Sequence, residues 1–123
     1  MTVTRMYPRL VVSDARSAIE FYVKVFGAVA GESFSDDSGK IVHAEVSFGA
    51  AGSVVCTVGV KDQGDGDEPV SVIVALDVTD PDEVAAAMEA NGATVIYPIA
   101  DQEYGRGGRL RDPWGIQWML LRP

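Results

Sequence analysis

Two stretches of the chain repeat one pattern, and this repeat constrains the fold more than any other feature. "VVSDARSAIEFYVKVFGAVA" covers residues 11–30, and "DVTDPDEVAAAMEANGATVI" covers residues 77–96. Each stretch has an aspartate suited to cap a helix, apolar residues at helical spacing, and a glycine where the helix can end. The capping residues, Asp14 and Asp80, are 66 positions apart (80 − 14). The repeat predicts two copies of one structural unit.

Strand-like runs surround both predicted helices, one before each helix and three after it. The runs cover residues 4–12, 28–35, 40–48 and 53–60 in the first half, and residues 70–78, 94–100, 108–111 and 116–121 in the second. The order is therefore β-α-β-β-β, twice. Halves of roughly 60 residues are marginal alone. We expect a single domain, with repeat 1 at about 1–60, a linker at 61–69 and repeat 2 at about 70–123.

Alternating side chains assign the strands to two faces, because successive strand residues point in opposite directions. In "IVHAEVSF", an apolar row suited to pack on a helix alternates with His43, Glu45 and Ser47. The same alternation places Tyr7, Arg9, Ile73 and Met119 on the face away from the helices. We expect an α+β fold in which a curved mixed sheet forms a concave cleft, and that cleft is the expected site.

The duplicated pattern, together with "HAEVSFG" and "YGRGGRLRDPWGIQWML", resembles the vicinal-oxygen-chelate superfamily, which includes glyoxalase I, dioxygenases and bleomycin-resistance proteins. The strings are similar to those of its PhnB-like branch, and the resemblance covers nearly the whole chain. It implies the glyoxalase/bleomycin-resistance fold and a homodimer. It does not fix the function, which in this superfamily depends on a few cleft positions.

Metal-using members of that superfamily hold a divalent cation at four cleft positions, which the resemblance places at Tyr7, Glu45, Ile73 and Met119. Only Glu45 keeps a family ligand, since isoleucine has no donor, a thioether suits copper(I), and neutral tyrosine is a poor ligand. We therefore expect no metal and no cofactor. An alternative is a non-standard metal site in which His43 and Glu45 share a cation, with Tyr7 as a third donor.

The leading functional hypothesis is a metal-independent protein that binds a small molecule and sequesters an antibiotic-like or other ligand. Its expected ligand-binding residues are Tyr7, Arg9, His43, Glu45, Ile73, Trp114 and Met119. Trp114 and Tyr104 lie on loops where they can stack on a flat ligand, although Trp114 also fits a purely structural role in a turn.

The second hypothesis is an enzyme of the lyase, isomerase or dioxygenase type. In this case burial raises the pKa of Glu45, which acts as general base beside His43 or Arg9. Against it stands a carboxylate that simply pairs with Arg9. A module that only binds other proteins is a third alternative.

Charge and composition exclude some partners. A net charge of −8 argues against nucleic acid and anionic membranes, and it weakly favours a cationic ligand. No apolar run approaches a membrane span and no secretory signal is visible, so we expect a cytoplasmic protein. Cys56 alternates with valines and is expected to be a buried core thiol. The arginines at 106, 109 and 111 are expected to form local salt bridges on a solvated hairpin rather than an anion site.

Overall fold

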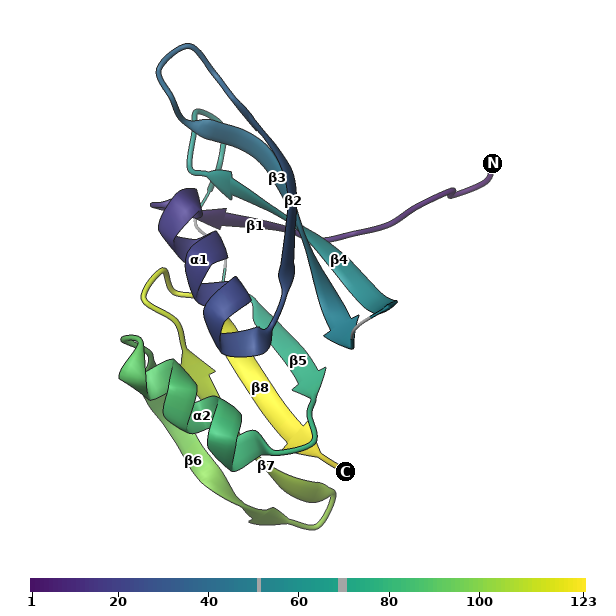
Figure 1. Cartoon of the computed structure of the whole chain (residues 1–123), viewed down its shortest axis with the longest axis vertical. Coiled ribbons are helices and arrows are strands. Elements are labelled where there is room, and N and C mark those ends of the chain that lie inside the picture. The colour runs from purple at the N-terminus through teal and green to yellow at the C-terminus, as the bar shows by residue number, and fades with distance from the viewer. Residues whose placement is uncertain (51, 69–70) are drawn as a thin grey trace. The chain divides into compact units, whose positions relative to one another are not determined.

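The computed structural model describes residues 1–50, 52–68 and 71–123, which form two compact units, 1–68 and 69–123 (Figure 1). Each unit has one helix and one four-stranded mixed sheet, in the predicted order β-α-β-β-β. The α+β fold class is confirmed, and the predicted sheet is built as two sheets, one per repeat. The single domain and the concave cleft stay predictions.

The two units share one topology. In the first, β1 (Arg9–Val12), α1 (Ala15–Phe26), β2 (Val29–Ser35), β3 (Ile41–Ala50) and β4 (Ser53–Asp62) form a sheet of order β1-β4-β3-β2. In the second, β5 (Ile73–Asp77), α2 (Pro81–Ala90), β6 (Thr94–Gln102), β7 (Gly105–Arg111) and β8 (Gln117–Arg122) follow the order β5-β8-β7-β6. The first strand of each unit pairs in parallel with the fourth, and the other pairs are antiparallel.

The helices begin and end where the repeat predicts. Asp14 accepts a hydrogen bond from the backbone N–H of Ser17 at 3.1 Å, and Asp80 accepts one from that of Glu83 at 3.1 Å. Gly27 follows α1 in the left-handed region, with φ of 66°. Such a conformation is costly for any residue with a Cβ, so glycine is suited to end the helix here.

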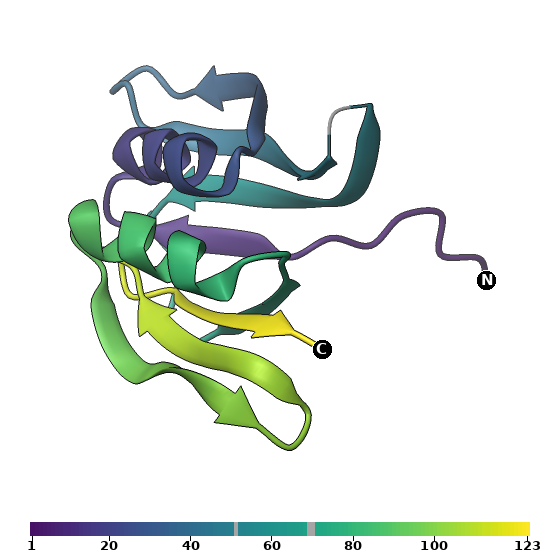
Figure 2. The same ribbon diagram turned by 60° about the horizontal axis from the view of Figure 1, so that its bottom comes forward.

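Each helix covers one face of its own sheet, as Figures 1 and 2 show. Tyr22 of α1 and Val46 of β3 are fully buried in the first unit, and Met88 of α2 and Trp118 of β8 are fully buried in the second. The residues that alternate with this core are half-buried or exposed on the opposite face. We call that opposite face the free face of each sheet. The predicted assignment of strand faces is thus confirmed over most of the sheet.

One residue departs from the alternation. Val42 was expected under the helix, but its side chain is 42% exposed and Ile41 is buried in its place. The pairing of β2 with β3 shifts register between Phe34 and Ser35, opposite this point. A bulge of this kind turns one residue out of phase with the rest of its strand.

Several strand boundaries differ from the sequence prediction, most clearly at the starts of β1 and β7. β1 begins at Arg9 rather than residue 4, after Pro8, which has no N–H to donate to a neighbouring strand. β7 begins at Gly105 rather than residue 108. The predicted start of β5 at Val70 lies outside the described residues.

The predicted linker at 61–69 also starts later than expected, because β4 runs to Asp62. The carboxylate of Asp62 accepts hydrogen bonds from the backbone N–H groups of Ala15 and Ile41, each at 2.7 Å. This residue therefore ties the start of α1 to the start of β3 and is not a solvated linker residue.

Cys56 is exposed, which corrects the prediction of a buried core thiol. Its neighbours Val54 and Val55 point to opposite faces of β4, and they are 65% and 77% exposed. Burial begins only at Val58. The alternation correctly assigned the faces, but neither face is covered at this end of the strand.

No helix among the described residues is both long and apolar enough to span a membrane.

Candidate functional site

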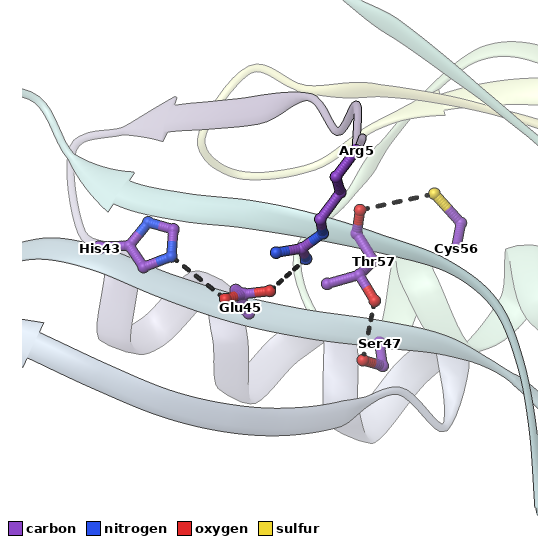
Figure 3. Close-up of polar contacts among 6 residues, drawn as sticks. All are labelled: Arg5, His43, Glu45, Ser47, Cys56 and Thr57. Carbon is purple, nitrogen blue, oxygen red and sulfur yellow. Dashed lines mark hydrogen bonds and ion pairs between the residues drawn. The ribbon is translucent and has the colours of Figure 1, made fainter. Parts of the chain in front are cut away.

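The free face of the first sheet carries a polar cluster around Glu45 (Figure 3). His43 and Glu45 are two residues apart on β3 and point the same way, with His43 Nε2 at 3.3 Å from Glu45 Oε2. The other carboxylate oxygen, Oε1, accepts a hydrogen bond from Arg5 Nη2. Arg5 belongs to the segment 1–8 that precedes β1. Glu45 is thus held between a cation from the N-terminal segment and an imidazole from its own strand.

This pairing lowers the pKa of Glu45, mainly through the hydrogen bond from Arg5 and next through that with His43. The enzyme hypothesis required a raised pKa, and that part of the prediction is wrong. The Glu45 side chain is 34% exposed, so burial is too weak to offset two favourable partners.

Arg9 does not pair with Glu45, although such a pair was one of the alternatives that the sequence left open. Its Nη2 donates instead to the carbonyl oxygen of Val42 at 2.8 Å. Arg5 was missed although it lies within the predicted strand 4–12, where its position in phase with Tyr7 and Arg9 was a usable signal. Tyr7 stays close to the cluster, since the Arg5 guanidinium lies 4.2 Å from its ring centre.

The free face of the second sheet has a cavity of about 250 Å³. It is lined by Tyr97, Gln102, Tyr104, Gly107, Gly108, Arg109, Met119, Leu120 and Leu121. The strand register brings three of these residues together, because Arg109 of β7 lies opposite Tyr97 of β6 on one side and opposite Met119 of β8 on the other. Met119 and Tyr104, which were expected near a ligand, line this cavity. Ile73 and Trp114, which were also expected near a ligand, are not among its lining residues.

Sequence reasoning missed Tyr97, Gln102 and Arg109 as lining residues. The usable signal was again parity, since Gly107 and Arg109 alternate with Leu110, which is fully buried. Gly107 is buried, and a Cβ at this position would lie 2.3 Å from the backbone oxygen of Leu120. Glycine here allows the close approach of the β8 backbone.

Arg106 forms the local salt bridges predicted for this hairpin. It contacts both carboxylate oxygens of Asp82, at 2.7 and 2.9 Å, and Asp101 at 3.0 Å. These bonds, first that to Asp82, raise its pKa.

Arg109 differs from the prediction of a salt-bridged hairpin. Its one side-chain hydrogen bond within residues 1–50, 52–68 and 71–123 runs from Nη1 to the side-chain oxygen of Gln117, at 3.5 Å, and its guanidinium lies 5.4 Å from the ring centre of Tyr97. Its Nε atom is buried without a hydrogen-bond partner among the described residues.

Trp114 lies in the turn after β7, which Asp112 organises. Asp112 is 3% exposed, and its Oδ1 accepts hydrogen bonds from the backbone N–H groups of Trp114 at 2.9 Å and Ile116 at 3.0 Å. Its Oδ2 accepts one from Trp118 Nε1 at 3.0 Å. These bonds fix the backbone of the turn, and stacking of the Trp114 ring on a ligand stays a prediction.

A model of the Glyoxalase/Bleomycin resistance protein/Dioxygenase superfamily matches residues 4–120. The chain belongs to this superfamily. An uncharacterized protein of Mycobacterium bovis is 37% identical over 128 residues, which cover 94% of this chain and 81% of that protein. Among solved structures, TioX from Micromonospora sp. ML1 is 26% identical with a TM-score of 0.75, over 98% of both chains.

Two more distant structures show the same fold. TnmS3 from Streptomyces sp. CB03234, described as an antibiotic binding protein, is 22% identical with a TM-score of 0.73, over 100% of this chain and 98% of that one. A PhnB protein from Bacillus cereus is 17% identical with a TM-score of 0.73, over 98% of this chain and 100% of that one. The resemblance to the superfamily is confirmed, and the PhnB protein shares its fold.

The residues present do not fit the divalent-metal site of the metal-using members of the glyoxalase/bleomycin-resistance superfamily. In the described part of the chain, no three His, Cys, Asp or Glu side chains gather in a way that can hold an ion. Glu45 is already occupied by the Arg5 guanidinium, which competes with any cation. Ile73 offers no donor atom, and Met119 offers only a thioether.

Proposed function

We propose that this chain is a metal-independent member of the glyoxalase/bleomycin-resistance superfamily that binds, and so sequesters, a small molecule. The cavity on the free face of the second sheet carries the proposal. Two tyrosines and several apolar side chains line it, with Arg109 and Gln102 as polar anchors. Ligand sites usually combine a mostly apolar lining with a few polar groups, and the volume of about 250 Å³ is near the lower end of their usual range.

Two further observations support a binding protein. TnmS3, which has the same fold, is described as an antibiotic binding protein. The carboxylate of Glu45, the one family ligand that this chain retains, is held by Arg5 and His43. The proposal includes the homodimer implied by the family, a single domain made of the two repeats, and a cytoplasmic address.

Equilibrium dialysis against a panel of cationic, neutral and anionic aromatic antibiotics tests the proposal, together with elemental analysis of the purified protein. We expect at least one compound to be retained and no stoichiometric zinc, nickel, manganese or iron. Tyr97→Ala should weaken the retention, whereas Val54→Ala, which shortens an exposed side chain of the first unit, should not. Failure of every compound to bind at millimolar concentration would contradict the proposal.

A second candidate is an enzyme of the lyase, isomerase or dioxygenase type that uses Glu45 as general base. The 3.3 Å contact between Glu45 and His43 favours it, because paired acid and base groups are typical of proton transfer. Glu45→Gln separates the two candidates. Lost turnover with retained ligand binding indicates an enzyme, and unchanged binding without any turnover in the wild type indicates a binding protein.

A further inference from the structure

We propose that the cavity of the second unit selects ligands in which a carboxylate is attached to a flat ring, with Arg109 binding the carboxylate and the cavity tyrosines contacting the ring. This inference rests on the proposed small-molecule function and adds the class of ligand. It reverses the weak preference for cations that the net charge of −8 suggested.

The argument begins with the charge of Arg109, which the protein leaves unmatched. Among the described residues, no carboxylate lies within 4.0 Å of its guanidinium. Arg106 on the same strand has two aspartates, so acidic partners are available to this hairpin. Arg109 is half-buried, so water hydrates its charge less fully than that of an exposed arginine. An arginine in a cavity without a partner therefore suggests that the partner is the ligand.

The hydrogen-bonding groups of Arg109 support the same conclusion. Its Nε is buried and has no acceptor, and its Nη1 has only the amide oxygen of Gln117 at the long distance of 3.5 Å. A buried donor without an acceptor is costly. A carboxylate has two oxygens at the spacing of the guanidinium fork, so it can accept hydrogen bonds from the terminal Nη groups of Arg109.

The surroundings of Arg109 indicate what the carboxylate is attached to. Tyr97 is 59% exposed and Tyr104 is 66% exposed, so both tyrosines present ring surface to solvent around the cavity. Met119 lies opposite Arg109 on β8 and adds a polarisable apolar surface. Aromatic rings gain by stacking on such side chains, which favours a flat ring next to the anion.

The net charge of the chain does not oppose this ligand at short range. Charges more than about 8–10 Å apart are largely screened at physiological salt, whereas a direct contact in a sheltered cavity is screened much less. The sign of the nearest group, a guanidinium, therefore decides which ligands the cavity accepts.

The test compares three probes of the same shape: 2-naphthoate, its neutral amide 2-naphthamide, and the cation 2-naphthylmethylammonium. Each is titrated into the full chain by calorimetry, and the Nε–H signal of Arg109 is followed by nitrogen-15 NMR. We expect naphthoate to bind roughly tenfold to hundredfold more tightly than the amide, the range for one charge-assisted contact, and to shift the Arg109 Nε–H signal. The cation should bind more weakly than the amide.

Two substitutions remove the same charge at different places. Arg109→Gln should abolish the preference for naphthoate over naphthamide. Arg111→Gln, on the same strand but exposed, should preserve it. Heteronuclear spectra of each variant verify that it is folded. Arg109→Lys retains the charge without the fork, so it should retain only part of the preference.

Three results would overturn the inference. If the amide or the cation binds as tightly as naphthoate, the cavity binds small molecules without selecting anions, and the proposed function survives alone. If none of the probes binds, the ligand class is wrong, and the antibiotic panel then decides the proposed function separately. If Arg109→Gln changes the sedimentation of the protein and leaves naphthoate affinity intact, Arg109 pairs with a second copy of the chain instead.

Discussion

Replacing Asp112 with asparagine should strongly destabilise the second unit, although it changes only one atom of the side chain. The Asp112 carboxylate accepts three hydrogen bonds, from the backbone N–H groups of Trp114 and Ile116 and from Trp118 Nε1. An asparagine can keep one oxygen for the two backbone groups. Its NH₂ group then faces the indole N–H, so two donors meet where a donor met an acceptor.

The magnitude follows from these three bonds. Trp118 is fully buried, so in the variant its indole N–H has no acceptor, which lowers the free energy of unfolding by about 1–3 kcal/mol. The other two bonds lose their charged acceptor, which weakens each by about 1 kcal/mol. The expected loss in the free energy of unfolding is therefore about 3–5 kcal/mol. This is a large fraction of the roughly 5–15 kcal/mol that stabilises a typical domain.

Urea unfolding followed by far-ultraviolet circular dichroism measures this loss, and a double-mutant cycle isolates its cause. Trp118→Phe removes the indole donor, so in that background Asp112→Asn should cost only about 2 kcal/mol. Asp101→Asn is the matched control, because the Asp101 side chain is 86% exposed and its removal should leave the unfolding midpoint unchanged. The reasoning fails if Asp112→Asn is as stable as wild type, or if its cost is the same in both backgrounds.

Three further predictions concern the first unit. Arg5, and next His43, lower the pKa of Glu45 from its ordinary value of 4.5. The contribution of the ionised Glu45 to the free energy of unfolding is therefore present above about pH 4.5 and is lost as the pH falls further. The difference in urea midpoint between wild type and Arg5→Gln should therefore be present at pH 7 and shrink at pH 3; an equal difference at both values contradicts the pairing. Cys56 should react with a disulfide reagent in the native protein, with Cys56→Ser as the blank, and reaction only after denaturation would show a buried thiol. Gly27→Ala should lower the free energy of unfolding by about 1–2 kcal/mol through backbone strain alone, since an added Cβ meets nothing within 4 Å; an unchanged urea midpoint would refute this.

The sequence predicted those parts of the fold that depend on local, periodic signals. Asp14, Asp80 and Gly27 mark helix ends through hydrogen bonds and dihedral angles confined to a few residues. The alternation in β3 and β8 reports which side chains face a helix, so it assigned His43 and Glu45 correctly to the free face. Such signals need no knowledge of distant segments.

The parts that failed depend on which segments meet. Cys56 has the alternation of a buried strand residue, but burial also requires a cover, and none reaches the start of β4. Glu45 was assigned a raised pKa because nothing in β3 indicates that Arg5, 40 positions earlier, lies against it. Asp62 looked like part of an acidic linker, although its two backbone partners come from α1 and β3. Each error concerns a contact between residues far apart in the sequence.

The two repeats share one topology but differ in whether the charged group on the free face is already paired, and this difference bears on where a ligand binds. The first sheet presents the Glu45 carboxylate, already neutralised by Arg5 and bonded to His43. The second presents the Arg109 guanidinium, whose Nε has no partner in the described part of the chain. A ligand at Glu45 must displace an existing ion pair, whereas a ligand at Arg109 meets a guanidinium that has no carboxylate partner among the described residues. The net gain from binding an ionic group is therefore larger in the second unit.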